Sequence, residues 1–146
     1  MIHAPLDIAI EHDGLHIAAL DWGGDREALL LLHPNGFCAG LFDPLARELR
    51  DSFRPIGVDL RAHGGTDEPP TVDGYAYEEM ARDVLAVLDA LGVPSAVALG
   101  ESLGGGVAVV VDRLRPGFVG WPSPPVSTTD KSGSITRSGT SPSRAR

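Results

Sequence analysis

The sequence predicts an α/β protein in which an N-terminal hairpin leads into a mostly parallel sheet with flanking helices. Three observations predict this class. An Asp-Gly pair separates two extended segments near the N-terminus, short apolar segments recur further along, and apolar residues at helical spacing lie between them. Strands that alternate with helices are joined by crossover connections, and such connections make neighbouring strands parallel.

The hairpin is expected over residues 6–10 and 15–20. Residues 6–10 alternate apolar and polar side chains, and residues 15–20 form a second extended segment. Asp13-Gly14 between them is a strong signal for a tight turn, since such a turn needs residues that tolerate a positive φ.

Buried strands are expected at residues 28–32, 55–60 and 96–99. The first is continuously apolar and stops at His33-Pro34-Asn35-Gly36. Its length and its Pro/Gly end favour a strand covered on both faces over a helix. Three helices are expected with these strands. The first has apolar residues at positions 41, 42, 45 and 49, the second runs from Tyr77 and stops at Gly92-Val93-Pro94, and the third begins at Leu103.

The composition excludes several classes of protein. The net charge of −8 argues against a nucleic-acid binder, which needs a basic face. We expect neither a secretory signal nor a transmembrane segment, because the first residues are not basic and no apolar segment is long enough to cross a membrane. The single cysteine suits a reducing compartment, so a cytoplasmic location is expected. No Cys/His cluster has metal-ligand spacing, and no phosphate-binding glycine loop is present.

Residues 117–146 differ from the domain expected over residues 1–116. Nineteen of these 30 residues are Ser, Thr, Pro or Gly, and Asp130 is the only acidic residue among them. Their few apolar side chains cannot form one face, so burial would not offset the entropy lost on ordering. The sequence therefore predicts a disordered tail.

The motif with the clearest chemistry is Gly100-Glu101-Ser102-Leu103-Gly104, a G-x-S-x-G between an expected strand and an expected helix. A sharp turn there lifts a serine nucleophile clear of the sheet, and glycines two residues away remove side chains that would collide with the crowded backbone. The helix that follows directs free N–H groups and its positive end toward charge developing near Ser102. A plain glycine-rich turn is the competing interpretation.

From about residue 6 to about residue 115 the chain resembles the α/β-hydrolase superfamily. The elbow, the order of strands and helices, and two further segments carry the resemblance. The stretch from Leu30 to Phe37 resembles the family's loop after the third strand, and Asp59-Leu60-Arg61-Ala62-His63-Gly64-Gly65-Thr66-Asp67 is similar to its D-x-R-G-H-G-x-S-D segment. The resemblance implies that this chain holds the N-terminal part of an α/β-hydrolase fold, which is then incomplete here.

The resemblance also implies roles for individual residues. Ser102 would be the nucleophile, and the backbone N–H of Leu103 would be one donor of the oxyanion hole. Pro34 stands where the family usually has glycine and has no N–H, so the second donor is the N–H of Asn35 or of Phe37. A serine at the elbow argues against relatives such as epoxide hydrolases, which use Asp there. We interpret His33 and His63 as structural, Cys38 as an ordinary loop thiol and Glu101 as a solvated or hydrogen-bonded carboxylate.

On this resemblance the chain is expected to be a serine hydrolase that acts on a small ester or similar acyl substrate without cofactor or metal. The family's triad follows the order Ser, acid, His. All five histidines precede Ser102, and only Asp112 and Asp130 follow it as acids. We therefore expect an N-terminal part that lacks the acid and the histidine of the triad.

Two explanations remain open for the missing residues. Either a short protein serves as a non-catalytic interaction module built on a partial fold, or the tail is out-of-frame translation of a longer gene. The abrupt change in composition near residue 116 favours the second. The sequence predicts no oligomeric state.

Overall fold

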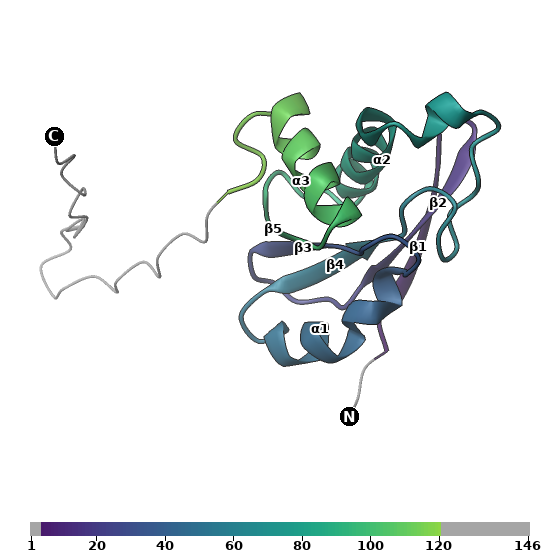
Figure 1. Cartoon of the computed structure of the whole chain (residues 1–146). Helices are drawn as coiled ribbons and strands as arrows, with labels where there is room; N and C mark the ends of the chain where they lie inside the picture. The colour runs from purple at the N-terminus through teal and green to yellow at the C-terminus, as the bar shows by residue number, and fades with distance from the viewer. Residues whose placement is uncertain (1–3, 121–146) are drawn as a thin grey trace, which may run out of the picture.

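The computed structural model describes residues 4–120 and confirms the α/β class (Figure 1). It contains one five-stranded sheet, made of β1 (Leu6–His12), β2 (Leu15–Asp21), β3 (Ala28–Leu32), β4 (Arg54–Val58) and β5 (Ala96–Gly100). The strand order is β1-β2-β4-β3-β5. The tail was predicted over residues 117–146, and all of it except residues 117–120 lies outside the described part of the chain.

The N-terminal hairpin forms as the sequence predicted. β1 and β2 are antiparallel, with Leu6 opposite Asp21. Asp13 and Gly14 turn the chain with φ values of 52° and 73°, which is the geometry that favours an Asp-Gly pair. β2 then pairs antiparallel with β4, so the hairpin forms one end of the sheet.

The parallel part of the sheet positions the site. β3 lies between β4 and β5 and is parallel to both, with Leu30 opposite Ile56 and Ala98. All five residues of β3 are buried, because the sheet is covered on both faces at this strand. The carboxyl ends of three neighbouring parallel strands therefore meet at one edge, and the loops that begin at His33, Asp59 and Glu101 lie together there.

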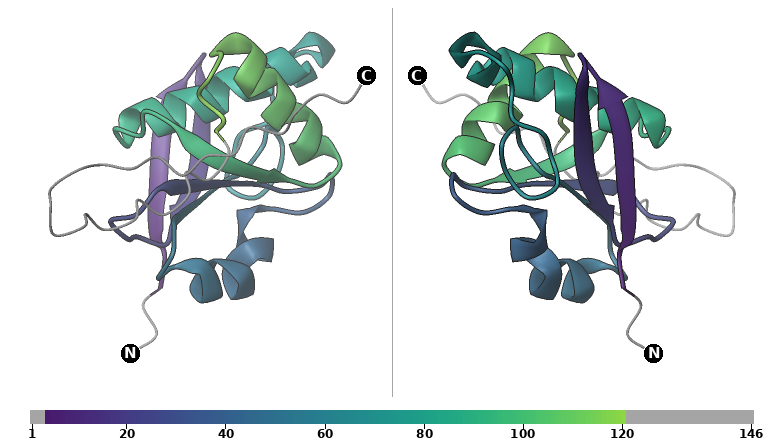
Figure 2. Two further views of the ribbon diagram at one scale, coloured as in Figure 1. Left: turned by 90° about the vertical axis from the view of Figure 1, so that its left-hand side faces the viewer. Right: turned by 90° about the vertical axis from the view of Figure 1, so that its right-hand side faces the viewer.

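Helices cover both faces of the sheet (Figure 2). On one face, α2 (Tyr77–Ala90) and α3 (Leu103–Leu114) pack against each other and enclose the larger apolar core. On the other face, α1 (Asp43–Leu49) follows a 3₁₀ turn, η1 (Ala39–Phe42), and encloses a smaller core around Trp22. A second 3₁₀ turn, η2 (Val72–Tyr75), precedes α2.

The apolar face predicted for the first helix is only partly correct. Phe42 and Ala46 are buried, whereas Leu41 and Leu45 are exposed. The helix begins only at Asp43, with Pro44 in its first turn, and the preceding 3₁₀ turn has a different number of residues per turn. The 3.6-residue spacing therefore does not continue from position 41 to position 49.

The boundary predicted after residue 116 also needs correction. Residues 117–120, which were assigned to the tail, pack against the sheet. Phe118 is 2% exposed, and Val119 forms a parallel bridge with Ala96 of β5. A short segment without periodicity can still be ordered when one aromatic side chain fills the core and its backbone bonds to a strand.

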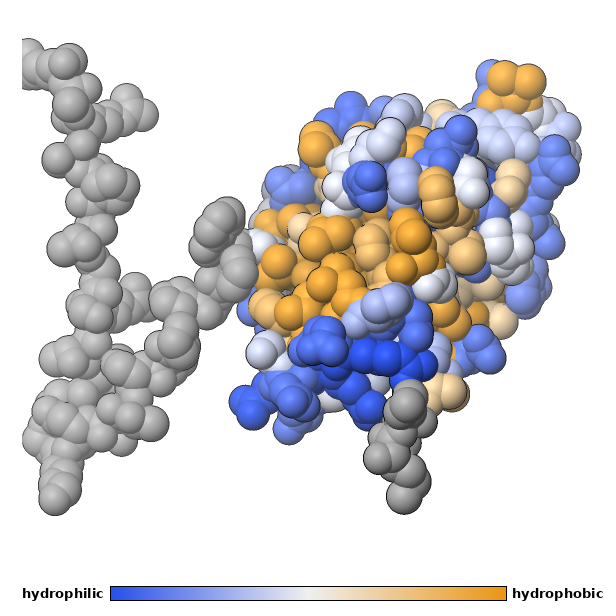
Figure 3. Space-filling model, turned by 60° about the horizontal axis from the view of Figure 1, so that its bottom comes forward, coloured by the Kyte–Doolittle hydropathy of each residue, from blue (hydrophilic) through white to orange (hydrophobic). Residues whose placement is uncertain are grey.

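Apolar side chains are not confined to the two cores. Figure 3 shows a broad apolar area on the side of the molecule that is lowest in Figure 1. The most exposed large apolar side chains include Val72, Val109, Leu6 and Phe37. Single exposed apolar residues are common on protein surfaces, and a contiguous area is more informative.

Candidate active site

Ser102 occupies a sharp turn between β5 and α3. Its backbone angles are φ 52° and ψ −113°, a region that residues with a Cβ rarely adopt. The residue is exposed, and its side chain makes no capping hydrogen bond to α3. The turn predicted from the G-x-S-x-G motif is therefore present, with a serine held in a strained conformation.

The two glycines of the motif are required by close backbone approach. A Cβ at Gly104 would lie 2.1 Å from the carbonyl oxygen of Leu32 in β3. A Cβ at Gly100 would lie 2.5 Å from the carbonyl oxygen of Gly104. Contacts below 3.0 Å with backbone atoms cannot be relieved by a side-chain rotation. The motif thus lets the first turn of α3 lie directly against the end of β3.

In the first turn of α3, the N–H group of Leu103 is free beside Ser102 within the described residues. Gly104 N–H donates to the Glu101 carbonyl at 2.9 Å, and Gly106 N–H donates to the Ser102 carbonyl at 3.1 Å. The N–H of Leu103 has no acceptor in residues 4–120. Such an amide, at the positive end of a helix, can donate to an oxygen that gains negative charge.

Ser102 and Leu103 line a cavity of about 710 Å³ that opens at the carboxyl ends of the parallel strands. This volume is within the range of small-molecule sites. The lining combines polar groups with aromatic and apolar side chains from the loop after β3, the loop after β4, η2, α2 and the elbow: Asn35, Ala62, His63, Tyr75, Tyr77, Met80, Ser102 and Leu103. The sequence analysis placed Tyr77 and Met80 on a helix face without predicting that they line a cavity.

Three consecutive amides follow Pro34, and the structure distinguishes them. Phe37 N–H donates to the Pro34 carbonyl at 3.3 Å, and Gly36 N–H donates to His63 Nε2 at 3.0 Å. Asn35 N–H has no acceptor among the described residues, and Asn35 lines the cavity together with Ser102. Of the two donors left open by the sequence, Asn35 lines the same cavity as Ser102, whereas the amide of Phe37 is bonded within its own turn.

His33 is buried and bonded through both ring nitrogens. Its Nε2 accepts the N–H of Leu60 at 3.0 Å, and its Nδ1 lies 2.9 Å from the Pro34 carbonyl. Burial disfavours the charged imidazolium and lowers the pKa of His33; the Pro34 carbonyl opposes this effect, and nearby His63 adds to it. This histidine links the loop after β3 to the loop after β4.

The loop from Asp59 to Asp67 is held by its own polar side chains. Asp59 accepts the N–H groups of Ala39 and Gly65 at 2.7 and 2.9 Å. Thr66 Oγ1 donates to the Asp59 carbonyl and accepts the N–H of Ala18. Asp67 accepts the N–H of His16 at 2.8 Å. The segment that resembles D-x-R-G-H-G-x-S-D therefore fixes the loop to the hairpin and to η1.

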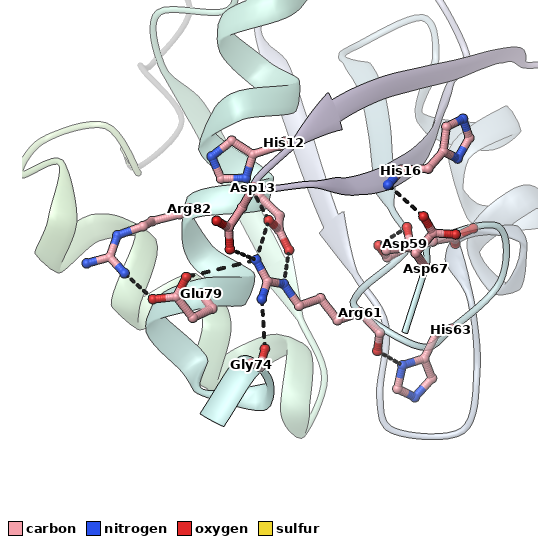
Figure 4. A network of polar contacts seen from close by, with 12 residues as sticks. His12, Asp13, His16, Asp59, Arg61, His63, Asp67, Gly74, Glu79 and Arg82 are labelled. Atoms are coloured by element: carbon pink, nitrogen blue, oxygen red, sulfur yellow. Dashed lines mark hydrogen bonds and ion pairs between the residues drawn. The ribbon is translucent and has the colours of Figure 1, made fainter. Parts of the chain in front are cut away.

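Arg61 is the centre of a buried ionic cluster that the sequence analysis did not predict (Figure 4). Its guanidinium donates to both carboxylate oxygens of Asp83, at 2.7 and 3.0 Å, and to the Gly74 carbonyl at 3.0 Å. Asp13 lies 3.3 Å away, and His12 Nδ1 lies 2.8 Å from Asp83. Hydrogen bonds with Asp83 raise the pKa of Arg61. A signal existed in the sequence, since Asp83 is an acid among the apolar positions of the second expected helix.

Within residues 4–120, no side chain is hydrogen-bonded to Ser102 Oγ, so the described residues show no base in place for it. The same residues contain no group of three His, Cys, Asp or Glu side chains placed to hold a metal ion. None of their helices is long and apolar enough to cross a membrane. Cys38 is a half-buried free thiol before η1, and Glu101 is exposed.

Comparisons with known proteins agree with the motifs. Residues 27–111 match the alpha/beta hydrolase fold family. The chain is 37% identical over 111 residues to a non-heme chloroperoxidase of Streptomyces lividans, covering 73% of this chain and 39% of that protein. It is also 37% identical over 105 residues to a bifunctional esterase/perhydrolase of Acinetobacter calcoaceticus, covering 69% of this chain and 37% of the relative.

Solved structures show the same fold. The crystal structure of an epoxide hydrolase of Vigna radiata superposes with a TM-score of 0.73 at 21% identity, over 80% of this chain and 38% of that one. A thioesterase domain from the curacin biosynthetic pathway superposes equally well, with a TM-score of 0.73 at 21% identity, over 80% of this chain and 44% of that one. The chain therefore spans less than half the length of each of these proteins.

Proposed function

The chain belongs to the α/β hydrolase fold family, and from this premise we propose that Ser102 is the nucleophile of a hydrolase that acts on an ester or similar acyl substrate. The observation that supports this most is the strained elbow, which places Ser102 at a cavity also lined by Leu103 and Asn35, whose amides have no acceptor within residues 4–120. Strain of about 1–3 kcal/mol at one residue persists only where the surrounding structure imposes it, and it is common at reactive sites.

The chemistry proposed is acyl transfer to Ser102 Oγ. As the serine oxygen bonds to the acyl carbon, the hydroxyl proton passes to a base and the carbonyl oxygen becomes negative. The amides of Leu103 and Asn35 would donate to that oxygen. The C–O bond to the leaving alcohol then breaks, and water later hydrolyses the acyl-serine. The apolar and aromatic lining supplied by Tyr75, Tyr77 and Met80 suits an apolar acyl or alkyl group.

Turnover needs the acid and the histidine that the family places after its serine, and the printed sequence has no histidine after Ser102. We therefore propose that this chain is acylated slowly and turns over substrate negligibly. In serine proteases that lack a triad member, an oxyanion hole and binding alone keep about 10³–10⁴-fold acceleration over water. Such a residual effect would make slow but site-specific acylation measurable.

Labelling with a fluorophosphonate probe tests this proposal. We expect a one-to-one adduct on the chain, located at Ser102 by peptide mass spectrometry and absent from Ser102→Ala. Ser95→Ala is the matched control, because Ser95 is an exposed serine at the opposite end of β5 and should leave labelling unchanged. An adduct that persists in Ser102→Ala, or a rate at Ser102 equal to that of the unfolded chain, would contradict the proposal.

A further inference from the structure

His63 is hydrogen-bonded to the residue that follows Asn35, whose backbone N–H is the proposed second donor of the oxyanion hole. It lines the same cavity as Asn35 and Ser102, and its Nε2 is 3.0 Å from the N–H of Gly36, the residue after Asn35. Gly36 has φ 84°, a conformation that glycine adopts without strain. The bond between Gly36 and His63 therefore fixes the peptide next to the Asn35 amide.

The hydrogen bonds determine which ring nitrogen carries the proton. His63 Nδ1 lies 2.9 Å from the Arg61 carbonyl, which can only accept, so Nδ1 is the protonated nitrogen. Nε2 is then unprotonated and can accept the Gly36 N–H. The Asn35 side chain lies beside the same nitrogen, with Oδ1 3.1 Å from Nε2, and a half-turn of this amide presents its NH₂ group instead. The bonds with the Arg61 carbonyl and the Gly36 N–H thus agree on one tautomer, with the proton on Nδ1 alone. The Asn35 amide fits this tautomer after its half-turn.

The residue that holds His63 is itself fixed. Arg61 is 2% exposed, and its guanidinium makes three hydrogen bonds to Asp83 and Gly74. Figure 4 shows the Arg61 carbonyl directed at His63 while its guanidinium points toward α2. A continuous set of contacts therefore runs from α2 through Arg61 and His63 to Gly36.

We propose that His63 is a positioning residue for the oxyanion hole: its neutral, Nδ1-protonated ring holds Gly36 so that the Asn35 N–H faces the cavity opposite Leu103. The catalytic part of this inference rests on the proposed function, whereas the tautomer and the Gly36 bond do not. His63 accepts the Gly36 N–H, and the neighbouring Asn35 N–H has no acceptor within residues 4–120.

NMR of the full chain tests the positioning without any activity. A long-range ¹H–¹⁵N spectrum should show His63 with protonated Nδ1 and unprotonated Nε2, and exposed His16 with a mixture of tautomers. In His63→Ala the Gly36 amide should exchange with solvent about three- to tenfold faster, which is the effect of losing one hydrogen bond. His63→Gln should restore protection, because the glutamine Oε1 can accept the same N–H.

The rate of fluorophosphonate labelling at Ser102 supplies the functional readout. His63→Ala should lower it about tenfold, His63→Gln should restore most of it, and His16→Ala should leave it unchanged. A His63 ring protonated at Nε2, or Gly36 exchange that is the same in the native chain and His63→Ala, would overturn the proposal even if Ser102 reacts. A native chain with the expected tautomer and no Ser102 labelling would instead contradict the proposed function.

Discussion

The elbow at Ser102 and the loop at Ala62 both turn the chain sharply after a parallel strand, and both hold a residue with a Cβ at positive φ, 52° and 63°. Their surroundings differ. In the loop, the side chains of Asp59, Arg61 and Thr66 are all hydrogen-bonded. At the elbow, the Ser102 hydroxyl and the Leu103 amide have no partner in residues 4–120. The same kind of strain therefore accompanies a structural network in one place and a free reactive group in the other.

The largest effect is expected from breaking the network of the loop. Arg61→Met leaves the Asp83 carboxylate buried without its cation, and removal of one partner of a buried pair lowers the free energy of unfolding by about 3–5 kcal/mol. The double variant Arg61→Met/Asp83→Leu should recover most of this loss, because no uncompensated charge remains. Urea denaturation of the two variants measures the difference. Equal destabilisation would show that the loop is not held by this ion pair.

A second large effect is expected at the elbow, from packing alone. Gly104→Ala places a Cβ 2.1 Å from the Leu32 carbonyl, and backbone displacement should lower the free energy of unfolding by about 3 kcal/mol. Gly105→Ala is the matched control in the same helical turn, since its nearest atom is 3.2 Å away, and a change within about 1 kcal/mol is expected. Similar losses in the two variants would contradict the role assigned to close approach.

The histidine that joins the two loops after β3 and β4 should make stability depend on pH. Burial lowers the pKa of His33 below its ordinary value of 6.5, so the unfolded chain binds a proton at a higher pH than the folded chain. The free energy of unfolding should therefore be highest above pH 6.5 and should fall as the pH drops from 6.5 toward the folded-state pKa.

Urea denaturation across this range measures the slope, and His33→Gln should reduce it. The carboxylates of Asp43 and Asp89, which are paired with arginine, should not contribute to the slope in this pH range. The pKa values of Asp43 and Asp89 are lowered by Arg47 and Arg115, so their contribution is lost only in more acidic solution. A slope of the opposite sign between pH 6.5 and 5.5 would contradict the neutral state assigned to His33.

Much of the fold could be predicted because its signals are local. The hairpin depends on Asp13-Gly14, the strand at Ala28–Leu32 depends on an uninterrupted apolar segment, and the elbow depends on glycines two residues from Ser102. Each of these features is specified by a few adjacent residues. The family resemblance is confirmed by the match of residues 27–111.

Other features could not be predicted because they depend on residues far apart in the chain. The Arg61–Asp83 pair joins positions 22 apart, and the Gly36–His63 bond joins positions 27 apart. The choice between Asn35 and Phe37 depended on the bond from the Phe37 N–H to the Pro34 carbonyl and on which residue lines the cavity, so the sequence alone left it open. The burial of Phe118 was missed because the surrounding composition suggested only a polar segment. The roles assigned to Ser102, Leu103 and Asn35 stay predictions.

The most direct test of the central claim, that the elbow stores strain for a free nucleophile, compares Ser102→Gly with Ser102→Ala by urea denaturation. Both remove the hydroxyl, and Ser102 makes no capping bond that either could lose, so only the Cβ differs. At an unstrained position glycine is less stable than alanine by about 0.4–1 kcal/mol. Our account predicts the reverse, with Ser102→Gly more stable than Ser102→Ala by about 1 kcal/mol, as also expected for Ala62→Gly over the native chain. A Ser102→Gly variant no more stable than Ser102→Ala would contradict it.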